Sequence, residues 1–477
     1  MNQPNILFIL TDQHNASISG FEGNRIIDTP SLDGLASQGM QFGKAYCQSP
    51  LCVPSRSSLL TGRYCRNINV YDNQDILDTA YDTIPGTFAA AGYSTALVGK
   101  AHFNGEQYHG YQYRPYGDIF GQGHQPDPRR VPEKGDAGLG DILYQAGPSQ
   151  IPLPLTQTEI CTHESVKWLQ SHVSLHPDQP FFLSVHYDKP HFPINPPPSL
   201  YEKYRDLVQL PPHWRHGLHG DSHLKKLSPF VRENFICEGS YQVPEETHLN
   251  CLAAYYGCIE WVDTNIGRLL ESLDYLGLSD NTIVVYSSDH GDMASYHGSW
   301  QKMVFYDHSS RVPLIMKYPG IIPEAEVCLD PVGLIDLFPT FCGMANLTIP
   351  EGLDGINLAP HFSGELIGRD RIYGESVLIH KPQFAGAMVR TNDWKCCYYL
   401  DGSVELYDME NDPEEENNLA IEESSTAEEL VEDIKQFWNP EEQIFRYNKN
   451  PKSPREKHFY PYSNQYFANG GWFDARP

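Results

Sequence analysis

The stretch of this chain best suited to chemistry carries a thiol four residues before an arginine. Residues 52–56 read CVPSR, and residues 60–63 read LTGR. Pro54 favours the first turn of a helix, which predicts a helix over residues 55–60 with Cys52 just before its positive N-terminal end. A thiol in that place can attack an anionic substrate. A buried structural cysteine explains the local spacing equally well, so both interpretations stay open at this point.

Polar side chains also follow four short apolar runs. The runs, each typical of a strand buried on both faces of a sheet, are residues 5–10, 93–98, 180–187 and 282–287. The polar residues after them are, in order, Asp12 with Gln13, Lys100 with His102, His191, and Asp289 with His290. Ends of parallel strands meet at one crevice, so we expect these side chains to converge.

The residue types in this set suit a metal ion and an anionic substrate. Two carboxylates with neutral oxygen and nitrogen donors match Ca²⁺, Mg²⁺ or Mn²⁺, whereas Zn²⁺ favours more histidine or cysteine. Arg56, Lys100 and Lys302 supply positive charge for an oxyanion. His102 and His191 can serve as acid and base near neutral pH. The combination indicates transfer of a tetrahedral oxyanion group, either sulfuryl or phosphoryl.

The elements that must position these residues alternate between strand and helix over most of the chain. A further buried strand is predicted at residues 312–318, and alternation over residues 387–404 predicts antiparallel strands. The predicted helices are residues 31–38, 55–60, 83–91, 156–172, 248–277, 331–342 and 426–438. We therefore expect an α/β catalytic domain over residues 1–370 and a subdomain with an antiparallel sheet and a tail over residues 371–477.

For two further groups of charged or histidine side chains, the sequence indicates a functional role less strongly. The long irregular segment at residues 103–154 carries basic residues that could face an anion or be solvated loop charges: Arg114, Arg129, Arg130 and Lys134. A second tract could bind a metal, but its setting of prolines and glycines favours a surface loop: His213, His216, His219 and His223.

Composition limits the classes of partner and compartment. The chain has 477 residues, with 34 Lys and Arg against 61 Asp and Glu, for a formal charge of −27. Such acidity argues against nucleic-acid binding. Any anion-binding site must therefore be a region of locally positive charge. The eleven cysteines lack paired spacing, which favours reduced thiols. Without a recognisable signal peptide or membrane span, we expect a cytoplasmic protein, and a homo-oligomer is compatible with the sequence.

The two motifs at residues 52–63 resemble the signature of the type I sulfatases. The resemblance extends to residues 5–13, 99–102, 189–193, 288–292, 297–302 and 405–413. It implies the alkaline-phosphatase-like fold, in which helices flank a large mixed sheet and a smaller C-terminal α+β subdomain contains an antiparallel sheet. It also implies that a formylglycine-generating maturation enzyme converts Cys52 to formylglycine.

The resemblance further implies a ligand set for one divalent cation. The ligands would be Asp12, Gln13, Asp289, His290 and the modified residue 52. Gln13 replaces an aspartate common in the family, and His290 stands where many members have asparagine. Ca²⁺ is the expected ion, with Mn²⁺ and Mg²⁺ as alternatives, because one carboxylate fewer lowers the negative charge of the site.

The implied mechanism gives each remaining residue a role. The hydrated formylglycine attacks sulfur, His191 with Lys302 protonates the leaving alcohol, and His102 takes the remaining diol proton as sulfate is released. Arg56 orients the diol, and Lys100 neutralises sulfate charge. Asn73 resembles a sulfate-contacting asparagine, although an ordinary turn residue fits its position nearly as well.

These implications predict a sulfuric ester hydrolase acting on a small sulfated saccharide. The alternatives are a phosphonate monoester or phosphodiester hydrolase, a choline- or arylsulfatase, and a catalytically silent carbohydrate-binding relative. The silent relative is disfavoured because every expected catalytic position is filled.

Overall fold

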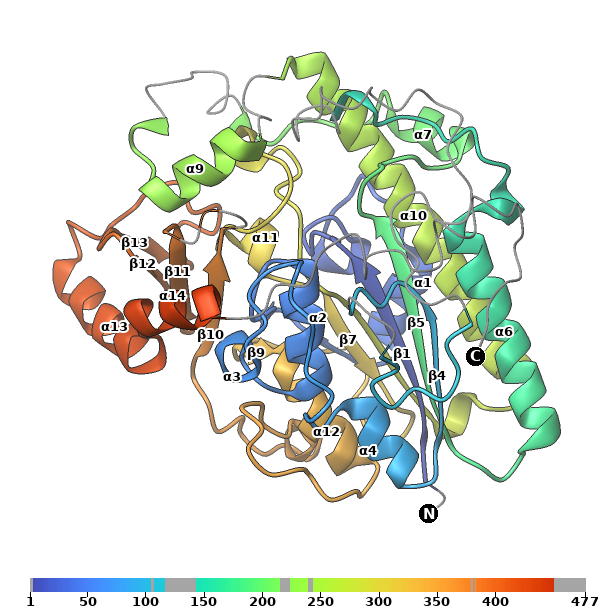
Figure 1. The fold of residues 1–477 in the computed structure, drawn as a ribbon. Coiled ribbons are helices and arrows are strands. Elements are labelled where there is room, and N and C mark those ends of the chain that lie inside the picture. Colours follow the sequence, from blue (N-terminus) through green and yellow to red (C-terminus); the bar gives the residue numbers. More distant parts are fainter. Residues whose placement is uncertain are drawn as a thin grey trace.

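The computed structural model describes residues 3–103, 107–115, 143–214, 224–238, 243–378, 381 and 383–449. Within these residues the chain builds a seven-stranded mixed sheet and a separate four-stranded antiparallel sheet (Figure 1). In spatial order, the large sheet contains β4 (Ser94–Gly99), β5 (Phe181–Pro190), β1 (Asn5–Asp12), β6 (Thr282–Ser288), β7 (Leu314–Lys317), β2 (Met40–Phe42) and β8 (Glu326–Cys328). The five strands predicted for this sheet are confirmed, and β2 and β8 are short additions.

The four strands that end in polar residues are parallel neighbours. β1 pairs with β5 on one side and with β6 on the other, and β4 pairs with the outer edge of β5. All of β1 and β5 is buried, as their continuous apolar sequences predict. β5 extends to Pro190, three residues beyond the predicted end, because Pro190 still pairs with Asp12.

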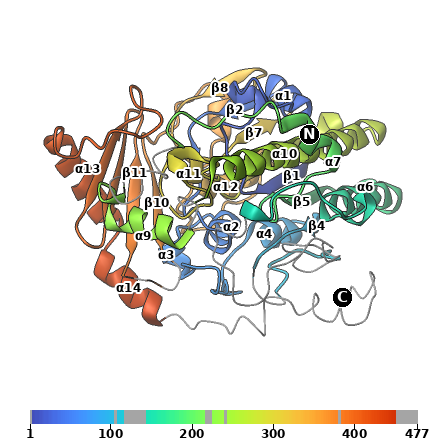
Figure 2. The same cartoon turned by 90° about the horizontal axis from the view of Figure 1, so that it is seen from above.

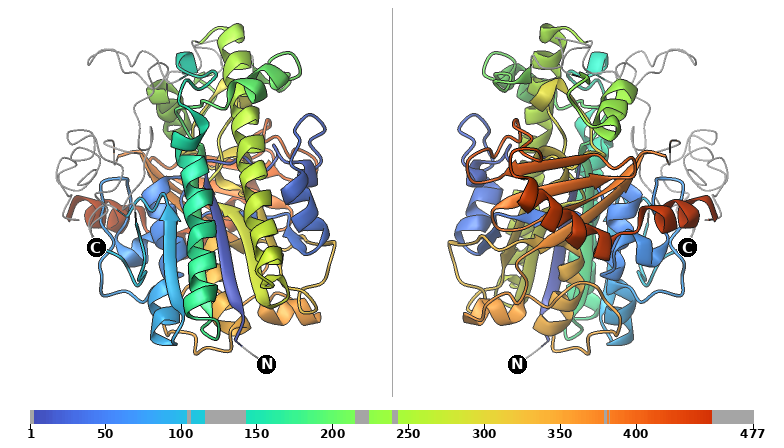
Figure 3. Two further views of the ribbon diagram at one scale, coloured as in Figure 1. Left: turned by 90° about the vertical axis from the view of Figure 1, so that its right-hand side faces the viewer. Right: turned by 90° about the vertical axis from the view of Figure 1, so that its left-hand side faces the viewer.

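Helices cover both faces of the large sheet. One face carries α1 (Pro30–Ser37), α6 (Gln157–Leu175) and α10 (Glu245–Tyr275), and the other carries α2 (Cys52–Thr61), α4 (Ile84–Ala90) and α12 (Leu337–Met344). Figure 3 shows α6 and α10 side by side across their face. Alternate residues of β1 serve the two cores, with Phe8 on the α2 side and Ile9 on the α10 side. The helix predicted at residues 331–342 begins only at Leu337, because residues 332–333 pair as β9 with β3 (Ala45–Tyr46).

The C-terminal sheet contains β10 (Ile372–Val377), β11 (Ala385–Arg390), β12 (Trp394–Tyr399) and β13 (Val404–Asp408), with α13 (Ser424–Phe437) packed against it. Seen from above, this sheet and α13 lie at one side of the molecule and α6 lies at the opposite side (Figure 2). The large mixed sheet flanked by helices and the antiparallel C-terminal sheet confirm the predicted fold class. Among the described helices, none has the length and apolar character needed to cross a membrane. The eleven cysteines, all within the described residues, are free thiols.

Candidate active site

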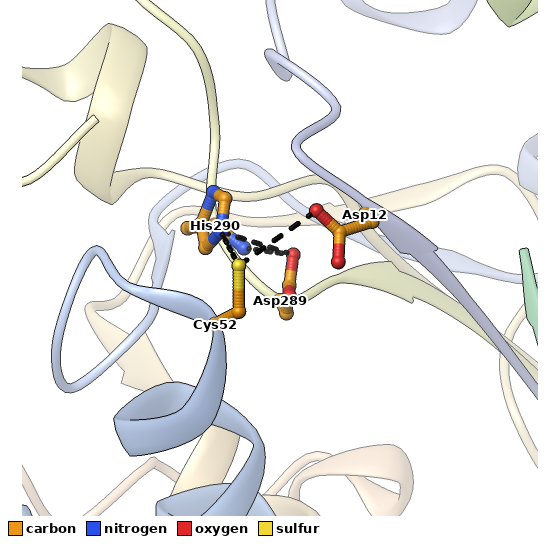
Figure 4. A group of neighbouring side chains, drawn as sticks. All are labelled: Asp12, Cys52, Asp289 and His290. Carbon is orange, nitrogen blue, oxygen red and sulfur yellow. Dashed lines mark hydrogen bonds and ion pairs between the residues drawn. The ribbon is translucent and has the colours of Figure 1, made fainter. Parts of the chain in front are cut away.

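The polar ends of the parallel strands and the first turn of α2 meet in one buried cluster. Asp12 is the last residue of β1, and Asp289 and His290 directly follow β6. Cys52 is the first residue of α2, which begins three residues before the helix predicted at residues 55–60. Figure 4 shows the four side chains converging. One ligand atom from each lies within 4.8 Å of the others.

Arg56 forms an ion pair with each of the two carboxylates of this cluster. It lies one helical turn after Cys52 and is 2% exposed. Its Nε donates to Oδ2 of Asp289 at 2.8 Å, and its Nη2 donates to Oδ2 of Asp12 at 2.8 Å. A third bond, from Nη1, goes to the carbonyl oxygen of Lys100 at 2.7 Å. The planar, forked guanidinium presents separate N–H groups to these three acceptors at once.

The carboxylate oxygens that Arg56 does not contact and the His290 imidazole are ligand types that suit a divalent cation. Oδ1 of Asp12 lies 4.0 Å from the Cys52 sulfur, and Oδ1 of Asp289 lies 3.6 Å from Nε2 of His290. Nδ1 of His290 lies 2.9 Å from the carbonyl oxygen of Gly291, which places the ring proton on Nδ1 and leaves Nε2 as the metal-binding atom. Burial lowers the pKa of His290, which favours this neutral form. Two carboxylate oxygens, one imidazole nitrogen and the residue 52 side chain therefore fit a divalent ion.

Positive charge lies directly beside this donor set. Nζ of Lys100 is 2.5 Å from Oδ2 of Asp12, and both side chains are fully buried. Burial by itself would raise the pKa of Asp12, but Lys100, His191 and Arg56 hold it well below its usual value. Asp12 is thus an anion throughout the neutral range.

The peptide between β4 and His102 brings Lys100 and His102 to the cluster through an unusual backbone. Gly99 has φ +112°, and a Cβ there would lie 2.0 Å from the carbonyl oxygen of His186 on β5. His102 has φ +56°, a conformation uncommon for residues other than glycine and frequent at functional sites. Burial, with Lys100 and Arg56, lowers the pKa of His102 well below its usual value. His102 is therefore neutral and able to accept a proton.

His191 directly follows β5 and lies beside Asp12. Its backbone N–H donates to the Asp12 carbonyl oxygen at 3.1 Å, and its Nε2 lies 3.8 Å from Oδ1 of Asp12. Its ring stacks on Phe192 with a centroid distance of 3.9 Å. Burial, followed by the nearby Lys100 and Lys302, lowers the pKa of His191 well below its usual value. The substrate-free site thus holds this imidazole neutral.

Gln13 occupies a different place from that expected of a simple metal ligand. Its side-chain NH₂ donates to the Asp292 carboxylate, and its amide oxygen accepts from the Lys302 ammonium. The amide oxygen is therefore shared with a cation instead of being directed only to the donor set. Asp292, which the sequence analysis did not single out, fixes the orientation of this amide. Its position in the Asp-His-Gly-Asp sequence at residues 289–292 is the signal that could have drawn attention to it.

Asn73 lies at the N-terminus of α2, next to Cys52. Its amide oxygen accepts a hydrogen bond from the backbone N–H of Val53 at 3.0 Å. This contact satisfies one of the free donors at the helix N-terminus. The contact also holds the Asn73 side chain beside the first turn of α2.

The other sequence candidates separate from this cluster or lie outside the described residues. Arg114 is buried, donates to the carbonyl oxygen of Gln107 at 2.9 Å and contacts the rings of Phe103 and Tyr108. His213 forms an ion pair with Glu416 of the C-terminal subdomain. The candidates outside the described residues are Arg129, Arg130, Lys134, His216, His219 and His223.

Comparison with known proteins identifies the family of this chain. Residues 4–347 match the sulfatase family, and residues 295–442 match the C-terminal region of N-sulphoglucosamine sulphohydrolase. The chain is 30% identical over 436 residues to choline-sulfatase of Rhizobium meliloti (strain 1021), covering 88% of this chain and 82% of the relative.

Two solved structures share the fold. One is a protein in complex with its substrate D-glucosamine-2-N,6-O-disulfate, with a TM-score of 0.75, 24% identity, and coverage of 95% of this chain and 100% of that chain. The other is the phosphonate monoester hydrolase of Agrobacterium radiobacter, with a TM-score of 0.74, 23% identity, and coverage of 92% and 96%. The family match spans most of the chain, from the first strand to α12, and includes the Cys52 motif and the four polar strand ends. The chain therefore belongs to the sulfatase family and is a sulfuric ester hydrolase.

Proposed function

We propose that this enzyme removes sulfate from a small sulfated saccharide at the cluster around residue 52. The observation that carries the proposal is the donor set of Asp12, Cys52, Asp289 and His290, whose ligand atoms lie within 4.8 Å of one another. Arg56 pairs with both carboxylates of this set, Lys100 pairs with Asp12, and Lys302 donates to Gln13 beside them. These buried cations offset the charges of the carboxylates, so the site can accept an anionic substrate in an otherwise acidic protein.

One divalent cation would be held by Asp12, Asp289, His290 and the side chain of residue 52. Such an ion polarises an oxygen of the bound ester and favours the ionised form of a nearby hydroxyl nucleophile. Ca²⁺ is the expected ion, and Mn²⁺ is the alternative that the His290 nitrogen makes reasonable. Gln13 joins this set only if its amide oxygen serves the ion as well as Lys302.

The nucleophile is proposed to be formylglycine made from Cys52 by a formylglycine-generating maturation enzyme. Burial, followed by the negative charge of Asp12, raises the pKa of the Cys52 thiol above its usual value. The reactive thiolate is therefore disfavoured in this position. The hydrated aldehyde instead offers a hydroxyl group at the same place, on the first turn of α2.

The surrounding side chains would bind the sulfate group and move protons. Lys100 and Lys302 would neutralise the sulfate charge, Arg56 fixes the positions of the Asp12 and Asp289 carboxylates, and Asn73 lies beside residue 52 at the start of α2. His102, being neutral, would accept the remaining proton of the hydrated formylglycine as sulfate is released.

His191 is proposed to supply the proton to the leaving alcohol. A bound sulfate offsets the Lys100 and Lys302 charges that lower the pKa of His191, so substrate binding favours its protonation. His191 would then become protonated only in the enzyme–substrate complex, where the leaving alcohol requires a proton.

The saccharide part of the substrate is supported by relatives. The protein of similar fold was solved with D-glucosamine-2-N,6-O-disulfate as its substrate. Phosphonate monoester hydrolysis is the second candidate activity, favoured by the similar fold of the Agrobacterium radiobacter enzyme. Choline sulfate is a third candidate, given the 30% identical relative.

The test combines mass spectrometry with substrate comparison. Protein produced with a formylglycine-generating enzyme should contain an aldehyde in place of the thiol at residue 52, and activity should rise with the converted fraction. Activity that persists in fully unconverted protein would contradict the proposed nucleophile. A sulfate ester and a phosphonate monoester with the same leaving group should differ in kcat/KM in favour of the sulfate, and the reverse order would favour the second activity.

A further inference from the structure

The turn that carries His191 is tied to the end of β5 by a buried lysine that contacts none of the proposed catalytic side chains. We propose that Lys189 is a positioning residue, whose ammonium fixes the turn at residues 190–193 and thereby aims the His191 ring at the leaving oxygen. The inference rests on the proposed role of His191 as proton donor.

Lys189 is 5% exposed, and its ammonium has three acceptors around it. Nζ donates to the carbonyl oxygen of Pro193 at 2.8 Å, and it lies 3.5 Å from the carbonyl oxygen of His191. The third partner is Oδ2 of Asp188 at 3.2 Å. An ammonium has three donors, so this arrangement uses all of them. A buried cation paired in this way has one defined position.

The two carbonyl groups that Lys189 contacts flank the one that orients the imidazole. Nδ1 of His191 lies 2.7 Å from the carbonyl oxygen of Phe192. That contact places the ring proton on Nδ1 and directs Nε2 toward the site, where it lies 3.8 Å from Oδ1 of Asp12. Holding the peptides on both sides of Phe192 therefore fixes the tautomer and the direction of the catalytic ring.

Other anchors of the turn do not replace the lysine. The backbone N–H of His191 is held by the Asp12 carbonyl oxygen at 3.1 Å, which fixes the start of the turn but not the Phe192 carbonyl. Asp188 is buried and serves as the counterion of Lys189. Its other oxygen has no hydrogen-bond partner among the described residues and lines a cavity of about 20 Å³ with Gln157 and Thr158. Asp188 therefore holds the lysine through one oxygen, at 3.2 Å.

Lys189→Met tests the proposal, because methionine keeps the length of the side chain and removes the donors. Two sulfate esters separate positioning from general damage: an alkyl sulfate, whose alkoxide needs a proton to leave, and 4-nitrophenyl sulfate, whose phenolate leaves without one. General acid catalysis contributes about 10²–10⁴-fold. We expect kcat for the alkyl sulfate to fall by about 10²-fold at nearly unchanged KM, and kcat for the aryl sulfate to change little. An equal loss on both substrates would overturn the proposal.

A double-mutant cycle with His191→Ala shows whether the lysine acts through the imidazole. In the His191→Ala protein, the additional Lys189→Met change should leave the alkyl-to-aryl rate ratio unaltered. A further fall in that ratio would contradict the proposal. If His191→Ala alone lowers both rates equally, the proton-donor role of His191 is wrong, a result distinct from failure of Lys189 to position it.

Asp188→Asn is the matched control, since it weakens the ion pair and leaves the ammonium on the two carbonyl groups. We expect lower thermal stability with a nearly unchanged alkyl-to-aryl ratio. If Lys189→Met does not fold, Lys189→Arg, which keeps the charge but displaces the donors, should still show the substrate-selective loss. A uniform loss in Lys189→Arg would again overturn the proposal.

Discussion

Two buried charge networks in this molecule use similar residues for different purposes. The strand-end network consists of Asp12, Arg56, Lys100 and Asp289 at the ends of β1, β4 and β6 and on α2. The inter-sheet network links the C-terminal sheet to α11 (Asp307–Ser310). Its centre is Lys395 on β12, paired with Asp307 and, at 2.7 Å, with Glu415. Both networks hold carboxylates beside cations.

The difference lies in the carboxylate oxygens that remain. In the inter-sheet network, Oδ1 of Asp307 accepts from Tyr46 at 2.9 Å and from Lys395, and Oδ2 faces Tyr46 and Arg311. The two oxygens of Glu415 accept from Lys395 and from the backbone N–H of Asp307. Every charge is matched within the protein, which is the requirement for a stabilising element.

In the strand-end network, Arg56 contacts only the Oδ2 atoms of Asp12 and Asp289. Oδ1 of Asp12 lies 4.0 Å from the Cys52 sulfur, and Oδ1 of Asp289 accepts from the backbone N–H groups of Gln13 and His290 and lies 3.6 Å from Nε2 of His290. A metal ion would complete this arrangement. The comparison teaches that burial and ion pairing do not distinguish an active site from a structural network, whereas carboxylates gathered with a nucleophile and an imidazole within reach of one ion do.

The largest expected effect that separates the networks is the loss of the proposed nucleophile. Cys52→Ala should lower kcat/KM by at least about 10⁴-fold, because no side chain replaces the attacking oxygen. The free energy of unfolding should change by only about 1 kcal/mol. Steady-state kinetics and urea unfolding of the same preparation would measure both. Cys47→Ala, at a buried thiol five residues earlier, is the matched control and should keep its activity.

The second effect is the reverse pattern in the inter-sheet network. Lys395→Met should lower the free energy of unfolding by about 3–5 kcal/mol, because it leaves the buried Glu415 carboxylate without its cation and removes one of the cationic partners of Asp307. The kcat/KM of the folded fraction should stay near that of the wild type. Lys435→Met on the surface of α13 is the control, with an expected change within about 0.5 kcal/mol. A strong loss of specific activity in Lys395→Met would show that the two networks are coupled.

The third effect is stabilisation by the metal. Added Ca²⁺ at 100 times its dissociation constant should raise the free energy of unfolding by about 2.7 kcal/mol, since the ion binds only the folded chain. The same gain is expected in Lys395→Met. Asp289→Asn should lose most of it, because one of the two anionic ligands becomes a neutral amide. Thermal unfolding across a Ca²⁺ and a Mn²⁺ titration gives the measurement, and an undiminished gain in Asp289→Asn would place the ion elsewhere.

The smallest effect concerns pH. Burial raises the pKa of Glu415 from 4.5 to about 7, although Lys395 opposes the shift. Between these values the folded protein keeps a proton that the unfolded chain has lost, so this carboxyl lowers stability as pH rises from 4.5 through 7. The free energy of unfolding of Glu415→Gln, measured relative to the wild type, should therefore increase over that interval. Urea unfolding at several pH values tests this, with Glu410→Gln on the exposed surface as the control. A flat difference would show that Glu415 ionises normally.

Much of the fold followed from sequence patterns that act locally. A strand buried on both faces must be apolar at every position, so residues 5–10 and 282–287 were identifiable without knowing their neighbours. The period of α10 and the motif that forms α2 were equally local. The short strands β2 and β8 were not predictable, because three residues carry too little periodic signal.

The sequence by itself determined which residue types stand at the ends of the parallel strands, since each polar group follows its own apolar run. It also determined, through the motif at residues 52–63, the family to which the chain belongs. The tertiary structure alone decided which atoms of these residues are engaged. Arg56 binds one oxygen of each carboxylate, Gln13 bridges Asp292 and Lys302, and Lys189 fixes the turn of His191. The first two of these depend on partners that lie more than 40 residues apart, and the third depends on how a proline-rich turn folds back on its strand, so packing and not local pattern decides them.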